Sequence, residues 1–241
     1  MNEDPIRVAI AIMPAGPDPE KHVLPVIGIY VMDPIGPGHY RTVHRDTHYI
    51  SGGCSPVDNE GIDLTYIKQT WPSGLHLPAV LKKCSESSMS AWMFVHALDK
   101  HLAKMQPNRP VEFILHNAES DLKFLSAHCV SASEHLRHIV NGCASPFDGR
   151  RIFDLATDYD MEVALRRRFS GWGTGGPYLM GGAPVQIAEC MALLRQTAVE
   201  AQRPRSDVQT SAWKNSIAYV MIPLTIFGIA LVILLKLIKT V

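Results

Sequence analysis

The sequence predicts an α/β domain built on a mixed sheet, followed by one membrane-spanning helix. Two observations predict the domain. The chain opens with three short runs typical of strands and joined by turns, and further apolar runs then alternate with segments of helical spacing. A third observation predicts the membrane helix, because residues 215–235 carry no charge and are almost wholly apolar. We expect four parts: a domain at 1–201, a linker at 202–214, the membrane helix at 215–235 and a short tail at 236–241.

The first three strands are predicted to form an antiparallel meander. Residues 7–13 are a short apolar run that ends before Pro14. Residues 23–32 form a second run, which stops at Asp33-Pro34, and residues 38–44 form the third strand. The short turns between these runs favour antiparallel pairing, because neighbouring antiparallel strands need only a tight connection.

The rest of the domain alternates helices with strands. Residues 51–77 are expected to be irregular, with one helical turn near 64–69. A helix at 91–102 is predicted from apolar residues at helical spacing behind a serine cap. The remaining elements are a strand at 110–116, a helix at 120–129, a short strand or helix lead-in at 151–155 and an amphipathic helix at 186–201.

The apolar run at 215–235 is long enough to cross a bilayer. A helix rises about 1.5 Å per residue, so about 20 residues span a hydrocarbon core of about 30 Å. Trp213 and Lys214 precede the run, and Lys236 and Lys239 follow it, as is typical of residues at a membrane interface. A buried helix of this length would show more polar residues at helical spacing. We therefore expect a C-terminal anchor, with the lipid bilayer as one partner.

Composition argues against a strongly basic nucleic-acid binder and against a secreted disulfide scaffold. The 23 Lys and Arg residues balance 23 Asp and Glu residues, so the chain has no overall positive field. The five cysteines are odd in number and form no CxxC pair, which fits free thiols in a reducing compartment. The acidic start at 1–5 lacks the pattern of a secretory signal. We expect the N-terminal domain in the cytosol.

The segment around Asp121 carries the most specific pattern in the chain. The apolar strand 113–115 is followed by His116-Asn117, and Asp121 stands in the next helix. This arrangement resembles the second motif of DEDDh 3′–5′ exonucleases, which have an RNase H-like fold. The resemblance implies three antiparallel strands followed by parallel strands, with helices on the flanks. Further positions resemble a phage and prophage subgroup, described as exodeoxyribonuclease VIII-like or exoribonuclease-like: Asp33-Pro34, 40–43, 63–65, Arg151 and Asp154.

The resemblance implies two-metal chemistry, but the chain lacks most of the ligands. Two divalent ions about 3.5–4 Å apart would activate a water and stabilise the leaving oxygen, and convergent carboxylates would hold them. The family's first strand supplies an Asp-x-Glu pair, where this chain has Ala11 and Met13. Its last motif supplies a general-base His and an Asp, where this chain has Gly181 and Gln186. Because only Asp121 remains, we expect a catalytically inactive domain that needs no cofactor.

Three alternatives stay open. Asp18 and Glu20 could be the missing acidic pair, although they follow a turn-forming Pro-Ala-Gly-Pro segment. A rearranged shell would give an active exonuclease that holds Mg²⁺ or Mn²⁺, with candidate ligands Asp121, Asp154, Asp158 and Glu189 in a cleft that also includes His116 and Asn117. A nucleic-acid binder at the membrane is the third alternative, through the basic triplet 166–168.

The other polar clusters are interpreted as structural. Histidines such as His135 and His138 have no Cys or carboxylate partner at zinc spacing, so they are interpreted as surface residues. The acidic residues at 158–162 are interpreted as a solvated helix start. The sequence thus favours a tail-anchored pseudo-exonuclease of phage or prophage origin at the inner face of a bacterial membrane. A protein partner is favoured over nucleic acid, because the net charge is zero.

Overall fold

A computed structural model gives the fold of the N-terminal part of the chain. The structure describes residues 4–51, 61–71, 75–105, 109–131, 147, 150–168 and 184–202. The chain divides into a first unit, Met1–Thr197, and a second, Ala198–Val241. Nearly all of the second unit lies outside the described residues, so the following account concerns the first.

The first unit is built on one five-stranded mixed sheet with the strand order β3-β2-β1-β4-β5. β1 pairs antiparallel with β2, and β2 pairs antiparallel with β3. β4 pairs parallel with β1, and β5 pairs parallel with β4. The strands span β1 Ile6–Met13, β2 Val26–Gly36, β3 His39–Tyr49, β4 Val111–Leu115 and β5 Arg151–Asp154. The predicted meander and the mixed α/β architecture are confirmed.

The hairpin between β2 and β3 is longer than the sequence predicts, because β2 continues through Asp33-Pro34. Asp33 is buried, and its carboxylate accepts from Arg41 Nη2 at 2.9 Å and from Arg109 Nη1 at 3.2 Å. This neutralisation allows the charged residue inside a strand. The hairpin turns instead at Pro37-Gly38, where Gly38 has a φ of 76° that favours glycine.

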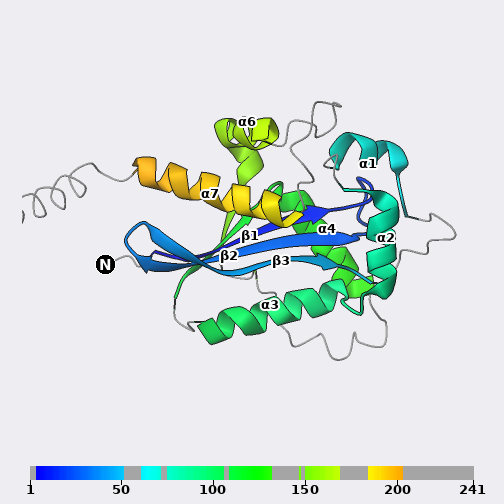
Figure 1. Cartoon of the computed structure of the whole chain (residues 1–241), viewed down its shortest axis with the longest axis horizontal. Helices are drawn as coiled ribbons and strands as arrows, with labels where there is room; N and C mark the ends of the chain where they lie inside the picture. Colours follow the sequence, from blue (N-terminus) through cyan, green and yellow to red (C-terminus); the bar gives the residue numbers. More distant parts are fainter. Residues whose placement is uncertain are drawn as a thin grey trace, which may run out of the picture. The chain divides into compact units, whose positions relative to one another are not determined.

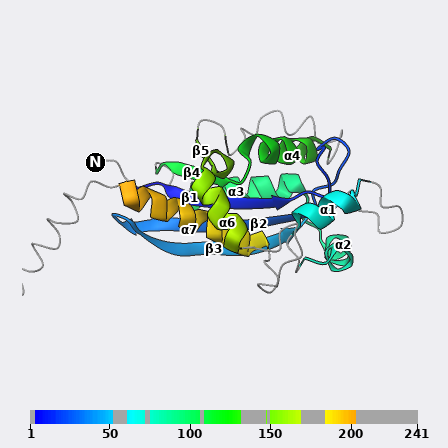
Figure 2. The same cartoon turned by 90° about the horizontal axis from the view of Figure 1, so that it is seen from above.

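Two short helices follow β3 in the sequence. α1, Leu64–Thr70, is close to the predicted helical turn, and Asp63 caps it by accepting from the Thr65 and Tyr66 amides. α2, Leu77–Glu86, was not predicted, and it buries Val80 and Cys84 one turn apart. In both views α1 and α2 lie together at one end of the sheet (Figure 1 and Figure 2).

One face of the sheet packs against α3, Ala91–Met105, and α4, Ala118–Ser131. The alternation of strand side chains puts every second residue on this face. The core joins residues from β1, β2 and β4 to α3 and α4: Ile6, Val8, Ile10, Ile27, Ile29, Val31, Phe113, Leu115, Phe94, Leu98, Leu102, Phe124 and Leu125. The predicted apolar face of α3 is confirmed.

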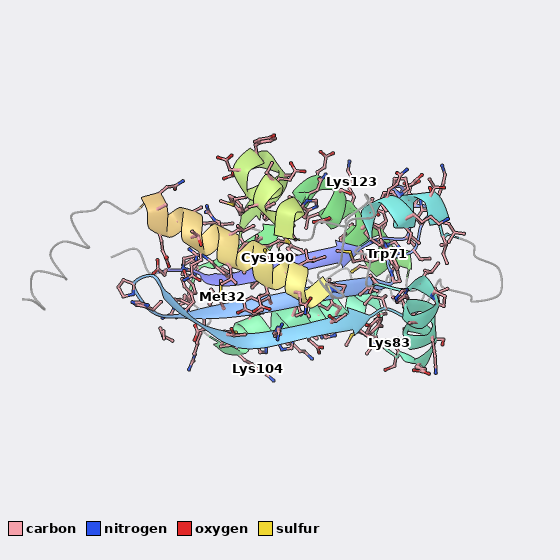
Figure 3. All side chains as sticks on the ribbon, turned by 45° about the horizontal axis from the view of Figure 1, so that its top comes forward. Met32, Trp71, Lys83, Lys104, Lys123 and Cys190 are labelled. Carbon is pink, nitrogen blue, oxygen red and sulfur yellow. The ribbon has the colours of Figure 1, made fainter. Side chains whose placement is uncertain are left out.

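α7, Pro184–Gln202, runs across the opposite side of the sheet from α3 (Figure 1). Buried Cys190 lies on α7 and buried Met32 on β2 (Figure 3). A charged cluster also lies here, because Glu112 of β4 accepts from Arg7 of β1 at 3.3 Å and from Arg195 of α7 at 2.7 Å. The short helix η1, Leu155–Thr157, and α6, Tyr159–Arg168, follow β5.

The membrane prediction falls beyond the part of the chain that the structure describes. No helix among the described residues combines the length and the apolar character needed to cross a bilayer. The predicted span at 215–235, the tail at 236–241 and the interface residues Trp213, Lys214, Lys236 and Lys239 all lie outside the described residues.

Candidate functional site

The candidate site lies where β4 ends and α4 begins, and its residues are tied together by helix capping. The Asn117 side-chain oxygen accepts from the Ser120 amide at 3.2 Å. The Asp121 carboxylate oxygen Oδ2 reaches back and accepts from the amides of His116 at 3.1 Å and Asn117 at 3.2 Å. The two side chains thus satisfy backbone donors at the helix start in the reciprocal manner of a capping box. The motif that resembles a metal site therefore stabilises the start of α4.

Burial makes Asp121 an unusual carboxylate. Its exposed fraction is 7%, and desolvation raises the pKa of its carboxyl from 3.8 to about 7. The two backbone amides oppose this shift, while the charge of nearby Asp154 adds to it. The Asp121 charge in turn contributes to a raised pKa for Tyr66 of α1, whose main cause is burial. Asp121 is therefore within electrostatic reach of Asp154 at the end of β5 and of Tyr66 in α1.

Asp154 closes the neighbouring strand. Its carboxylate oxygen Oδ1 accepts from the Ala156 amide at 3.1 Å and caps η1. The same amide donates to the His116 carbonyl oxygen at 2.9 Å, which ties the end of β5 to the end of β4. Asp154 at the carboxyl end of β5 and Asp121 in the helix that follows β4 thus stand at the same end of the sheet, a common position for sites in α/β proteins.

The first strand brings apolar side chains to the same region. Ala11 and Met13 are buried, and Ala11 stands one residue beyond the last β1–β4 pair, Ile10 with Leu115. Ala11 also pairs with Gly28 of β2, and the first turn of α7 packs directly on Gly28. Gln186 lies in that turn and is exposed. β1, α4 and α7 therefore approach one end of the sheet, and β1 contributes no carboxylate there.

The other predicted ligands have partners elsewhere. Glu189 forms an ion pair with Arg45 of β3 at 2.9 Å. Asp158 caps α6 through the Met161 amide at 3.1 Å, and the acidic residues after it lie in the first turn of that helix. Asp18 lies in a turn and accepts from the Glu20 amide. Within the described ranges, only one set of three or more ligating side chains has its atoms within 4.8 Å of one another: His44, Asp46 and His48.

Several predicted features lie outside the described residues. These are Gly181 and the pair His135 and His138. The backbone of the basic triplet 166–168 belongs to α6.

Sequence reasoning missed two features of the site region and its surroundings. The first is Tyr66, which comes within electrostatic reach of Asp121. Its helix α1 is tied to the end of β1, because the Trp71 indole donates to the Pro14 carbonyl oxygen at 2.8 Å. No sequence signal marks that contact. The cluster His44, Asp46 and His48 could have been found from its spacing, since alternate residues of a strand share one face.

Comparison with models of known protein families and with curated protein sequences found no match. The fold and the site together define the class of the protein at a coarse level. It is a mixed α/β domain in which a buried carboxyl and a neighbouring acid stand at the carboxyl ends of parallel strands.

Replacing Asp121 with asparagine is expected to change how stability depends on pH. Since folding raises the pKa from 3.8 to about 7, the folded state holds a proton that the unfolded chain releases, and stability falls as pH rises through this window. An asparagine carbonyl oxygen can accept the same two amides without ionising. The free energy of unfolding of Asp121→Asn, relative to that of the wild type, should rise by about 2 kcal/mol between about pH 5 and about pH 8. Urea unfolding at the two pH values measures it.

The control for this measurement is Asp160→Asn, which changes an exposed carboxylate in the first turn of α6. It should show no such gain. If the free energies of unfolding of Asp121→Asn and the wild type differed by the same amount at both pH values, the raised pKa of the buried carboxyl would be contradicted.

Proposed function

We propose that the N-terminal unit is an RNase H-like domain of the DEDDh exonuclease type that has lost its metal site and acts by binding. The arrangement of the strands supports this proposal. An antiparallel meander of β1, β2 and β3 is extended by parallel β4 and β5 on the other side of β1, as expected for an RNase H-like sheet. The positions that resemble the first and second family motifs then fall at the same end of the sheet.

The observation that carries the proposal is the state of Asp121. A metal ligand needs a free oxygen lone pair directed at the ion, and two Mg²⁺ ions need several carboxylates. Asp121 instead directs Oδ2 at two backbone amides. Ala11 and Met13 offer no oxygen from β1. This environment favours a structural role for Asp121, and with it a domain that does not cleave nucleic acid.

The membrane anchor is the second part of the proposal. Residues 215–235 would hold the domain at the cytosolic face of a bacterial inner membrane, in keeping with a phage or prophage origin. The balanced charge of the chain favours a protein partner there over nucleic acid. The function is then recruitment of that partner to the membrane surface.

The test is an activity assay on the full chain, extracted with detergent from the membranes of expressing cells. We expect the chain to sediment with membranes and to need detergent for release. Labelled single-stranded DNA and RNA, with Mg²⁺ or Mn²⁺, should release no nucleotides above the level of Asp121→Asn. An active DEDDh exonuclease serves as the positive control.

Asp121→Asn is the suitable reference variant because it keeps an acceptor for the two amides and so preserves the fold. Metal-dependent release of nucleotides that disappears in Asp121→Asn would establish an active exonuclease in place of the pseudoenzyme. Recovery of the chain in the soluble fraction would remove the membrane part of the proposal.

A further inference from the structure

A cluster of imidazoles and one carboxylate lies on the edge strand β3, away from the site described above. His44, Asp46 and His48 alternate along the strand, so their side chains share one face. They pair in register with Val31, Ile29 and Ile27 of β2, which belong to the core beneath α3. The three polar side chains therefore lie at the rim of the α3 side of the sheet.

The side chains of this cluster converge. Residues four apart on an extended strand are about 13 Å apart at the backbone. The rings of His44 and His48 nevertheless have centroids only 6.2 Å apart, so the two imidazoles lean toward each other across Asp46. Asp46 Oδ2 lies 3.9 Å from His48 Nε2. One ligand atom from each of the three residues lies within 4.8 Å of the other two.

A second element adds another imidazole beside the cluster. His101 of α3 places its ring 5.5 Å from the ring of His44. Its Nε2 atom is buried and has no hydrogen-bond partner within the described part of the chain. Because most buried polar atoms in folded proteins have a partner, this imidazole is available to a ligand beside His44.

We propose that His44, Asp46 and His48 form a Zn²⁺ site on β3, next to His101 of α3. Two imidazoles and a carboxylate are the ligand types of open zinc sites, while Mg²⁺ prefers an all-oxygen shell. Zinc ligands stand about 2.0–2.2 Å from the ion, hence about 3.4 Å from one another in a tetrahedron. Shifts of about 1 Å in the side-chain ligand atoms would bring them to these distances from the ion. The half-exposed Asp46 leaves a side of the ion open to solvent.

The site is independent of the proposed function, since it uses none of the residues around Asp121. The test uses the full chain in detergent, freed of metal with a chelator. Zn²⁺ is titrated in competition with a chromophoric chelator, and Co²⁺ reports tetrahedral geometry through its visible absorption. We expect one more tight Zn²⁺ equivalent in the wild type than in His44→Ala, His48→Ala or Asp46→Asn. Each variant should lose at least about tenfold in affinity for that equivalent.

The matched control is His39→Ala, which removes an exposed histidine from the same strand but outside the cluster. It should bind as the wild type does, so that binding elsewhere in the chain cancels in the comparison. Asp46→Asn is the variant that should keep the fold, because this side chain is exposed and does not pack in the core. Saturating Zn²⁺ should also raise the melting temperature of the wild type more than that of Asp46→Asn. Equal zinc stoichiometry and affinity in the wild type, His39→Ala and Asp46→Asn would overturn the proposal.

Discussion

Glu112→Gln is expected to destabilise the protein by about 3–5 kcal/mol, as measured by urea unfolding at neutral pH. Glu112 is 6% exposed, and its carboxylate lies between the guanidinium groups of Arg7 and Arg195. Arg7 is itself only 2% exposed. An amide in place of the carboxylate leaves a buried positive charge without its counter-ion, which is far more costly than losing an exposed pair.

The loss of stability in Glu112→Gln should exceed that from breaking a single ion pair, because the cluster of Arg7, Glu112 and Arg195 joins three elements. Arg7 belongs to β1, Glu112 to β4 and Arg195 to α7, and Arg195 also stacks on Phe153 of β5 with 4.1 Å from its guanidinium carbon to the ring centroid. Loss of the central carboxylate therefore weakens the attachment of α7 to the sheet. Cleavage within α7 by a protease should become faster in the variant.

The control is Glu119→Gln, the same chemical change in an exposed pair. Glu119 contacts Lys123 at 2.7 Å, but the two side chains are 80% and 63% exposed. Such an exposed pair contributes little to stability, because water and salt screen its charges. Similar losses in the two variants would show that the buried cluster does not hold α7.

Gly28→Ala is expected to destabilise the protein by about 3 kcal/mol, because a methyl group there would overlap the backbone of Pro184 and Val185. A flexible side chain could move aside, but a helix backbone can move only with its helix. α7 would have to shift away from β2, and the packing of buried Ile187 and Met191 would loosen with it. Thermal and urea unfolding measure the loss.

Gly36→Ala is the matched control for this change. Gly36 also lies in β2, but an added methyl group would meet no atom within 4 Å. Gly36 also lacks a positive φ, so alanine fits its backbone. The variant should stay within about 0.5 kcal/mol of the wild type. A Gly28→Ala protein as stable as Gly36→Ala would mean that α7 is free to move away from the sheet.

The strands buried on both faces were the most predictable part of the fold. β1 and β4 read as nearly continuous apolar runs, which is the pattern of central strands covered by helices on two sides. The end of β2 was not predictable in the same way. Asp33 and Pro34 are typical turn residues, and only the distant Arg109 and the facing Arg41 explain why the strand continues.

The position of the candidate site could be predicted from the sequence, but the hydrogen bonding and the pKa of Asp121 could not. The spacing from Asn117 to Asp121 gave the position of the acid at the start of α4. Whether its oxygens face an ion or the backbone depends on local geometry that the spacing does not contain. The burial that sets the pKa of Asp121 depends on packing by other elements, and the nearby Tyr66 comes from α1, far away in the sequence.

The two borders of the sheet differ in length but share one property. β5 has only four residues, and β3 carries charged or titratable side chains along most of its length, with an irregular register opposite β2. Short, charged or distorted borders offer a poor template for an incoming strand of another molecule. Copies of this chain crowded together should therefore resist joining edge to edge into aggregates.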